Sequence, residues 1–236
     1  TEKYGKEFLR EGGLRVYTTL DLNLQNIAET VVKEGAAANK KYGAYNAALV
    51  AVEPATGKVL AMAGGKDYFG SPEPKGCNPG INCKFEPNVN VATSERQPGS
   101  SFKPYMYLTS FKPEYGLTPM SKVLDVPTNF GTAGGRAYIP QNYDGSSHGL
   151  ITIRKALAGS LNVPAVRTLA IIGVEPVVKT AHDLGISSPL KNCGLSLVLG
   201  GCEIQLVDHV GAFAVLANGG KGTGATAFNR IEDKHG

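Results

Sequence analysis

The 236-residue sequence predicts an α+β fold, and three observations favour it. Short apolar runs separated by turn residues lie early in the chain, while segments with helical spacing dominate from about residue 100 onward. Strands and helices do not alternate as they would in a parallel α/β sheet. Apolar residues make up 42% of the chain and charged residues only 19%, which excludes a disordered chain and a coiled coil.

The N-terminal part of the chain is expected to hold one extended segment and one helix. Residues 14–19 form the extended segment, and Asp21 then provides a favourable helix N-cap. Apolar side chains from Leu24 to Val32 repeat at helical spacing. We expect Gly35 to end this helix and residues 36–45 to form a connector.

A β-hairpin follows the connector. The apolar runs 48–52 and 59–63 flank the turn sequence Pro54-Ala55-Thr56-Gly57, and this arrangement predicts two antiparallel strands. Residues 66–90 are rich in polar residues, glycine and proline, so we expect a long loop there.

Five helices are expected after residue 98, and two of them, 164–172 and 176–184, combine a proline at the start with a glycine after the end. They begin near residues 98–100 and then cover about 153–158, 164–172, 176–184 and 204–217. Residues 112–150 are expected to hold short extended pieces and turns.

The four cysteines form two local pairs, Cys77 with Cys83 and Cys193 with Cys202. Neither pair has the spacing of a zinc site, and the four histidines do not flank them, so we expect no metal site. Two interpretations remain open. The cysteines are either four unrelated buried thiols or two short disulfides, and disulfides would indicate an oxidising, extracytoplasmic compartment.

Charge and composition exclude several kinds of partner. The net charge is +4 and the basic residues are scattered, so we expect no nucleic-acid partner. No apolar run approaches the roughly 20 residues of a membrane span, and the first residues do not resemble a signal peptide. Any membrane anchor is therefore expected outside this sequence. No strand precedes the glycines near Lys221 as a phosphate-binding loop requires, and we expect no cofactor.

Ser100 and Lys103 form an S-x-x-K pattern. Two side chains three residues apart on a helix lie on one face, so the lysine can contact the hydroxyl and, if neutral, accept its proton. The pattern alone is weak, and the pair Ser188 and Lys191 matches it too. Only Ser100 follows a turn that leads into a helix start, where free N–H groups can stabilise an oxyanion.

Ser160-Leu161-Asn162 lies between two expected helices. Spacing alone favours a structural role in which Asn162 caps the following helix, because asparagine is a favoured N-cap residue.

Taken in order, several segments resemble the transpeptidase domain of class A (bifunctional) penicillin-binding proteins. Residues 96–104, Arg-Gln-Pro-Gly-Ser-Ser-Phe-Lys-Pro, are close to the nucleophile signature of that family, and Ser160-Leu161-Asn162 matches its S-x-N motif. The other segments that resemble it are residues 11–21, 48–57, 138–143, 156–166, 196–200 and 217–220. The resemblance implies a penicillin-binding-protein and serine β-lactamase-like fold, with helices flanking an antiparallel sheet and a helical subdomain.

The resemblance also implies a function, that of a peptidoglycan D,D-transpeptidase. Ser100 would attack the D-Ala-D-Ala amide of a stem peptide and form an acyl-enzyme, with Lys103 as its base. Ser160 would relay a proton to the leaving nitrogen, and Asn162 would bind substrate and Lys103. β-Lactam antibiotics would stop at the acyl-enzyme. The implied location is extracytoplasmic, in the bacterial cell envelope, either in the periplasm or at the outer face of the inner membrane.

The third motif of that family, K-T-G, has no match in the 236 residues, because Lys221-Gly222-Thr223-Gly224 has a different order. The resemblance thus implies that residues 1–45 are an entry segment after an absent glycosyltransferase domain and membrane anchor, and that residues 46–236 are a transpeptidase domain without its C-terminal part. Such a chain is expected to react with penicillin about a thousandfold more slowly than an extended one, because an oxyanion donor and the partner of the substrate carboxylate are lost.

Two other functions share these motifs. A serine β-lactamase or D,D-carboxypeptidase is disfavoured by the Arg-Gln-Pro-Gly start and by the segment Ala217-Asn218-Gly219-Gly220. A non-catalytic cell-wall binding fragment would keep the fold without turnover. Covalent labelling by a fluorescent penicillin separates an enzyme from a binding fragment, and the rate of deacylation separates the two kinds of enzyme.

Overall fold

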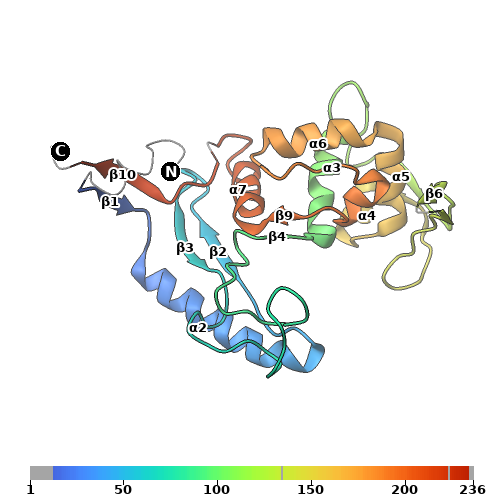
Figure 1. The fold of residues 1–236 in the computed structure, drawn as a ribbon. Coiled ribbons are helices and arrows are strands. Elements are labelled where there is room, and N and C mark those ends of the chain that lie inside the picture. The colour runs from blue at the N-terminus through green and yellow to red at the C-terminus, as the bar shows by residue number, and fades with distance from the viewer. Residues whose placement is uncertain (1–12, 134, 223, 234–236) are drawn as a thin grey trace. The chain divides into compact units, whose positions relative to one another are not determined.

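The computed structural model describes residues 13–133, 135–222 and 224–233, which fall into two compact units (Figure 1). The first unit combines the chain up to Ser94 with the segment from Leu206 onward, and the second is Glu95–Gln205. Both units contain helices and antiparallel strand pairs, which confirms the α+β fold. Among the described residues, no helix has the length and apolar character needed to span a membrane.

The first unit contains a hairpin, two long helices and a strand pair made by the two ends of the described chain. Its elements are β1 (Arg15–Thr18), α2 (Leu22–Asn39), a 3₁₀ helix (Lys40–Tyr42), β2 (Leu49–Val52), β3 (Val59–Ala63), α7 (Leu206–Ala217) and β10 (Phe228–Glu232).

The predicted hairpin is confirmed, since β2 and β3 pair antiparallel with Leu49 opposite Ala63. Helix α2 packs its buried face, which includes Ala28 and Val32, against β3. Strand β1 pairs with β10 at the other end of the sequence, and Figure 1 shows these two strands side by side.

Helix α2 begins as predicted and ends later than predicted. The Asp21 carboxylate accepts hydrogen bonds from the backbone N–H groups of Asn23 and Leu24 at 2.9 and 3.1 Å, as an N-cap does. The helix passes through Gly35 and ends at Asn39, so the expected end at Gly35 is wrong. The three alanines after Gly35 have the highest helix propensity and offset the loss of about 1 kcal/mol for an interior glycine.

The long loop after β3 is cross-linked. Cys77 and Cys83 form a disulfide with their Cα atoms 5.1 Å apart. The Glu73 carboxylate accepts from the ammonium groups of Lys40 at 2.8 Å and Lys66 at 2.7 Å. These contacts fix the predicted polar loop on the first unit.

The second unit is mostly helical and carries the S-x-x-K and S-x-N segments. Its elements are β4 (Glu95–Arg96), a 3₁₀ helix (Gly99–Phe102), α3 (Lys103–Ser110), β5 (Lys122–Asp125), β6 (Thr132–Ala133), β7 (Arg136–Ala137), β8 (Gly149–Thr152), α4 (Ile153–Ala158), α5 (Asn162–Ile172), α6 (Val174–Asp183), a 3₁₀ helix (Gly194–Leu199) and β9 (Ile204–Gln205).

Helix α3 lies at the centre of this unit and packs against both α5 and α6. Phe102, Tyr105 and Met106 are fully buried there. The 3₁₀ helix Gly194–Leu199 is closed at its base by the second disulfide, Cys193–Cys202, with the Cα atoms 5.7 Å apart. Both cysteine pairs are therefore joined, which leaves no free cysteine in the chain.

Three helix starts differ from the expected positions. Helix α5 starts at Asn162 and α6 at Val174, each two residues before the proline expected to come first. No N–H group in the first turn has an intrahelical partner, so proline is tolerated throughout that turn and does not mark its first residue. Helix α7 starts at Leu206, because Ile204–Gln205 pairs with β4 as strand β9.

Candidate active site

The turn before α3 presents Ser100. Gly99 has a left-handed φ of +60°, and this lets the chain turn from Pro98 into the 3₁₀ helix that contains Ser100. The Ser100 carbonyl accepts from the Lys103 backbone N–H, which joins the 3₁₀ helix to α3. The Ser100 side chain is exposed, and its hydroxyl forms no hydrogen bond within the part of the chain that the structure describes.

Lys103 is the most unusual residue of this region, because its side chain is completely buried. Its ammonium nitrogen Nζ lies 2.5 Å from the Ser160 carbonyl oxygen, 2.7 Å from Asn162 Oδ1 and 3.2 Å from Ser160 Oγ. Burial disfavours the charged form and lowers the pKa of Lys103 to about 8. The neutral amine is therefore far more populated near neutral pH than in an ordinary exposed lysine.

Ser160 joins α4 to α5 in a strained conformation. Its φ is +49°, in the left-handed region that favours glycine. Its N–H donates to the Leu157 carbonyl at 3.0 Å, and the next residue, Leu161, donates to the Ala156 carbonyl at 2.9 Å. The turn ends α4 and directs both the carbonyl and the hydroxyl of Ser160 to Lys103.

Asn162 does not cap α5, so the structural role favoured by its spacing is wrong. The N-cap residue is Leu161, and Asn162 is the first residue of the helix. Its side chain accepts from Lys103 Nζ through Oδ1 and donates from Nδ2 to the Gln141 carbonyl at 2.8 Å. The bond to Gln141 fixes which end of the amide faces the lysine.

The hydrogen-bond partners of Lys103 suit a neutral amine that can accept a proton. The Ser160 carbonyl and Asn162 Oδ1 are acceptors only, and they match the two N–H donors of a neutral amine. The lone pair is then left for a hydroxyl proton, from Ser160 or from an incoming Ser100. The S-x-x-K pattern and the resemblance together predict that Lys103 and Ser160 lie within hydrogen-bond distance of the Ser100 hydroxyl. Neither contact to Ser100 is formed among the described residues, although Lys103 Nζ and Ser160 Oγ are bonded to each other at 3.2 Å.

A pocket of about 640 Å³ lies in the first unit, between α2 and the loop that follows β3. Its polar lining includes Glu29, which is bonded to Gln25, and Lys66, which is bonded to Glu73. None of the four predicted site residues lines it. We place the candidate site at Lys103 because, among the residues that the structure describes, only there do a hydroxyl, a buried amine and an amide converge.

Gln141 and Asn142 are contributors that sequence reasoning did not assign. They lie in the segment 138–143, which resembles the family, but spacing gave no role to either residue. Their position beside Asn162 depends on folding over about twenty intervening residues.

The strain at Ser160 leads to a paired prediction. Ser160→Gly should have a free energy of unfolding about 1 kcal/mol greater than Ser160→Ala, because only glycine relieves the left-handed backbone. The resemblance implies a reaction with penicillin, and both variants, which lack the hydroxyl, should then be acylated more slowly than the parent. Urea unfolding and stopped-flow acylation of the full-length protein test this. Equal stabilities of the two variants would show that the backbone is unstrained, and an unchanged acylation rate would show that the hydroxyl is unused.

The family described as the penicillin binding protein transpeptidase domain matches residues 47–234. The chain is 35% identical over 98% of its length to Penicillin-binding protein 2D of Bacillus subtilis, and 32% identical over 89% of its length to Penicillin-binding protein 1A of Rickettsia conorii. It covers 31% and 24% of those two proteins, so it spans about a third or less of the curated relatives it matches.

Solved structures agree on the fold. The structure of PonA1 from Mycobacterium tuberculosis in complex with penicillin V superposes with a TM-score of 0.72 at 24% identity, over 100% of this chain and 59% of the other. The chain therefore belongs to the penicillin-binding protein transpeptidase family, as its resemblance to the class A members predicted.

Proposed function

We propose that this chain carries the acyl-serine site of a peptidoglycan D,D-transpeptidase that β-lactams acylate. Ser100 is the nucleophile, Lys103 its base, Ser160 the proton relay and Asn162 a substrate-binding residue. The observation that supports this assignment most strongly is the buried Lys103 amine, bonded to both Ser160 and Asn162. This arrangement favours a catalytic site over a non-catalytic binding module, because a binding surface does not require a buried amine held by a hydroxyl and an amide.

The proposed reaction proceeds in two transfers. Ser100 Oγ attacks the carbonyl carbon of the D-Ala-D-Ala amide while its proton passes to Lys103 Nζ. The C–N bond then breaks, and Lys103 returns the proton through Ser160 to the departing amine of D-Ala. An amine from a second stem peptide attacks the resulting ester and loses a proton along the reverse path. A peptide crosslink forms, and Ser100 is regenerated.

β-Lactams fit the first transfer only. Ser100 Oγ bonds to the β-lactam carbonyl carbon and the C–N bond of the ring breaks. The released nitrogen stays tethered to the acyl group through the rest of the opened ring, so it remains in the site. The penicillin V complex of the PonA1 structure supports β-lactam binding by analogy. The proposed partners are therefore stem peptides that end in D-Ala-D-Ala and β-lactam antibiotics.

The proposed location is extracytoplasmic, in the bacterial cell envelope. Two disulfides support it, because such bonds persist in oxidising compartments and are rare in the cytosol. We also propose that residues 46–236 belong to the transpeptidase domain and that residues 1–45 lead into it. The family match over residues 47–234 supports the position of that boundary.

The test is the formation and lifetime of a covalent adduct. The full-length protein, incubated with penicillin G, should gain the mass of one penicilloyl group and retain it after removal of free drug. A transpeptidase should lose the adduct slowly, because water is excluded as the second substrate. Rapid loss with continued turnover of the drug would instead identify a β-lactamase. No adduct at any drug concentration would leave a non-catalytic binding module.

A further inference from the structure

Helix α5 begins without a local cap. Its N-cap residue, Leu161, has no side-chain acceptor to offer, yet the first N–H groups of the helix lie next to the site. The N–H groups of Asn162 and Val163 both donate to Oδ1 of Asn142, at 2.8 and 3.2 Å. Asn142 is buried and lies twenty residues upstream, so it serves α5 as a cap supplied from outside the helix.

The orientation of the Asn142 amide is fixed by a buried carboxylate. Its Nδ2 group donates to both oxygens of Asp125 at 2.9 Å and to the Ser146 carbonyl at 2.8 Å. A flipped amide would direct its oxygen at the Asp125 carboxylate and its NH₂ at the N–H groups of α5. The negative charge of Asp125 also polarises the amide, and this strengthens Oδ1 as an acceptor for the positive end of the helix.

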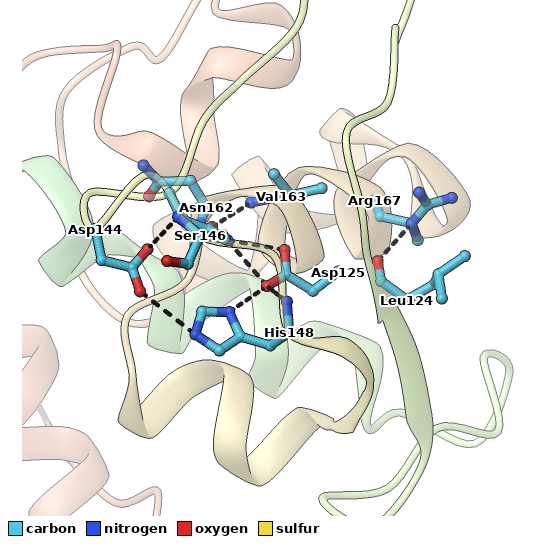
Figure 2. Close-up of polar contacts among 9 residues, drawn as sticks. Leu124, Asp125, Asp144, Ser146, His148, Asn162, Val163 and Arg167 are labelled. Atoms are coloured by element: carbon cyan, nitrogen blue, oxygen red, sulfur yellow. Dashed lines mark hydrogen bonds and ion pairs between the residues drawn. The ribbon is translucent and has the colours of Figure 1, made fainter.

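His148 holds Asp125 from the other side. Its backbone N–H and ring Nδ1 lie 3.0 and 2.6 Å from Asp125 Oδ2, and its Nε2 lies 3.4 Å from Asp144 Oδ2. Figure 2 shows the His148 ring between the two carboxylates, with Asn162 and Val163 on the far side of Asp125. Asp125 is completely buried, so its carboxylate depends on these protein donors for its hydrogen bonds.

We infer that Asp125, Asn142 and His148 form a positioning network that holds the start of α5, and through it the two acceptors of the Lys103 amine. Asn142 fixes the backbone of Asn162, while its neighbour Gln141 fixes the Asn162 side chain. Asn162 Oδ1 and the Ser160 carbonyl, on either side of Leu161, then meet Lys103 Nζ. These three are positioning residues, since none of them touches the amine. The catalytic consequence of this inference rests on the proposed function.

The first experiment replaces the cap. Asn142→Ala in the full-length protein should lower the rate of acylation by penicillin by about 10²-fold, the usual effect of a reacting group misplaced by about 1 Å. NMR of the protein labelled with ¹³C at lysine Cε should show the Lys103 titration at a lower pH than in the parent. The amine stays buried but loses acceptors that favour its charged form. Lys103→Met assigns the signal.

Three further variants separate positioning from general loss of stability. His148→Asn keeps a donor toward Asp125 and should retain more of the parental acylation rate than His148→Ala. Thr180→Val removes a buried hydroxyl of α6, bonded to Lys112 at 3.0 Å and to the Pro176 carbonyl at 3.0 Å, in the same unit. It should lower the melting temperature but leave the Lys103 titration and the acylation rate unchanged.

The two hypotheses fail in different ways. A parent protein that never reacts with penicillin would refute the proposed function, while the NMR titration would still decide the network. A Lys103 titration that is the same in Asn142→Ala as in the parent would overturn the inference, even if acylation slowed. A titration that rises toward the ordinary lysine value would also overturn it, since it would mean that the variant had only admitted water.

Discussion

Replacing Lys103 with methionine should lower the rate of acylation by penicillin by about 10²–10⁴-fold, the usual contribution of a general base. Methionine fills a similar volume without an ionisable group, so the fold should persist. The free-energy cost of burying a charged ammonium group should be absent in this variant. Stopped-flow acylation and thermal unfolding of the full-length protein measure the two effects. A variant that reacts as fast as the parent would remove Lys103 from the proposed mechanism.

The pH dependence of the acylation rate tests the role of Lys103 in a second way. The acylation rate of the parent should rise with pH through about 8, as Lys103 becomes neutral.

The free energy of unfolding should also depend on the protonation of Lys103. Between pH 8 and the ordinary lysine pKa near 10.5, the unfolded chain binds the Lys103 proton and the folded chain does not. The stability of the parent relative to Lys103→Met should therefore increase as the pH rises through this window. A flat difference would show that Lys103 titrates normally.

Gly200→Ala should destabilise the second unit by about 2–5 kcal/mol, the sum of an overpacking and a left-handed backbone penalty. Gly200 has a φ of +75°, and a Cβ atom there would lie 2.2 Å from the backbone nitrogen of Gly99. The obstruction is main chain, so it cannot move aside as a flexible side chain would. Because Gly99 directly precedes Ser100, the variant should also displace the nucleophile and slow acylation.

Gly194 offers a matched control at the other end of the same 3₁₀ segment. Its φ is +54°, but a Cβ atom there would meet nothing within 4 Å. Gly194→Ala should lower the free energy of unfolding by only about 1–2 kcal/mol, the penalty for a left-handed backbone, and should keep the parental acylation rate. Denaturant unfolding and penicillin labelling of both variants test the comparison. Equal losses of stability in the two variants would show that the close contact between the backbones of Gly200 and Gly99 is not needed to hold the turn before Ser100.

Local features of this fold could be predicted from sequence because short-range physics determines them. The hairpin follows from two apolar runs and a turn, and the start of α2 follows from the Asp21 carboxylate. Gly35 was misleading because a run of alanines and the packing of α2 against β3 outweigh one glycine. The helix starts before Pro164 and Pro176 were missed because proline fits any position of a first turn.

The candidate site could be predicted only in part. Ser100 and Lys103 are close in sequence, so their pattern is visible, although weakly. Ser160 and Asn162 lie 57 and 59 residues beyond Lys103, and only the resemblance suggested that they meet it. The left-handed φ of Ser160 and the cap that Asn142 supplies to α5 depend on tertiary contacts that no local pattern encodes.

The most direct test of the account is the position of the penicilloyl group. The full-length protein is labelled with penicillin, digested and sequenced by tandem mass spectrometry, with Ser100→Ala and Ser101→Ala as a matched pair. Ser101 is a suitable control because it is the adjacent serine on the same 3₁₀ turn, and its hydroxyl donates to the Pro98 carbonyl at 2.6 Å. We expect the adduct on Ser100 in the parent and in Ser101→Ala, and no adduct in Ser100→Ala. An adduct on Ser101 or Ser160, or one that survives in Ser100→Ala, would contradict it.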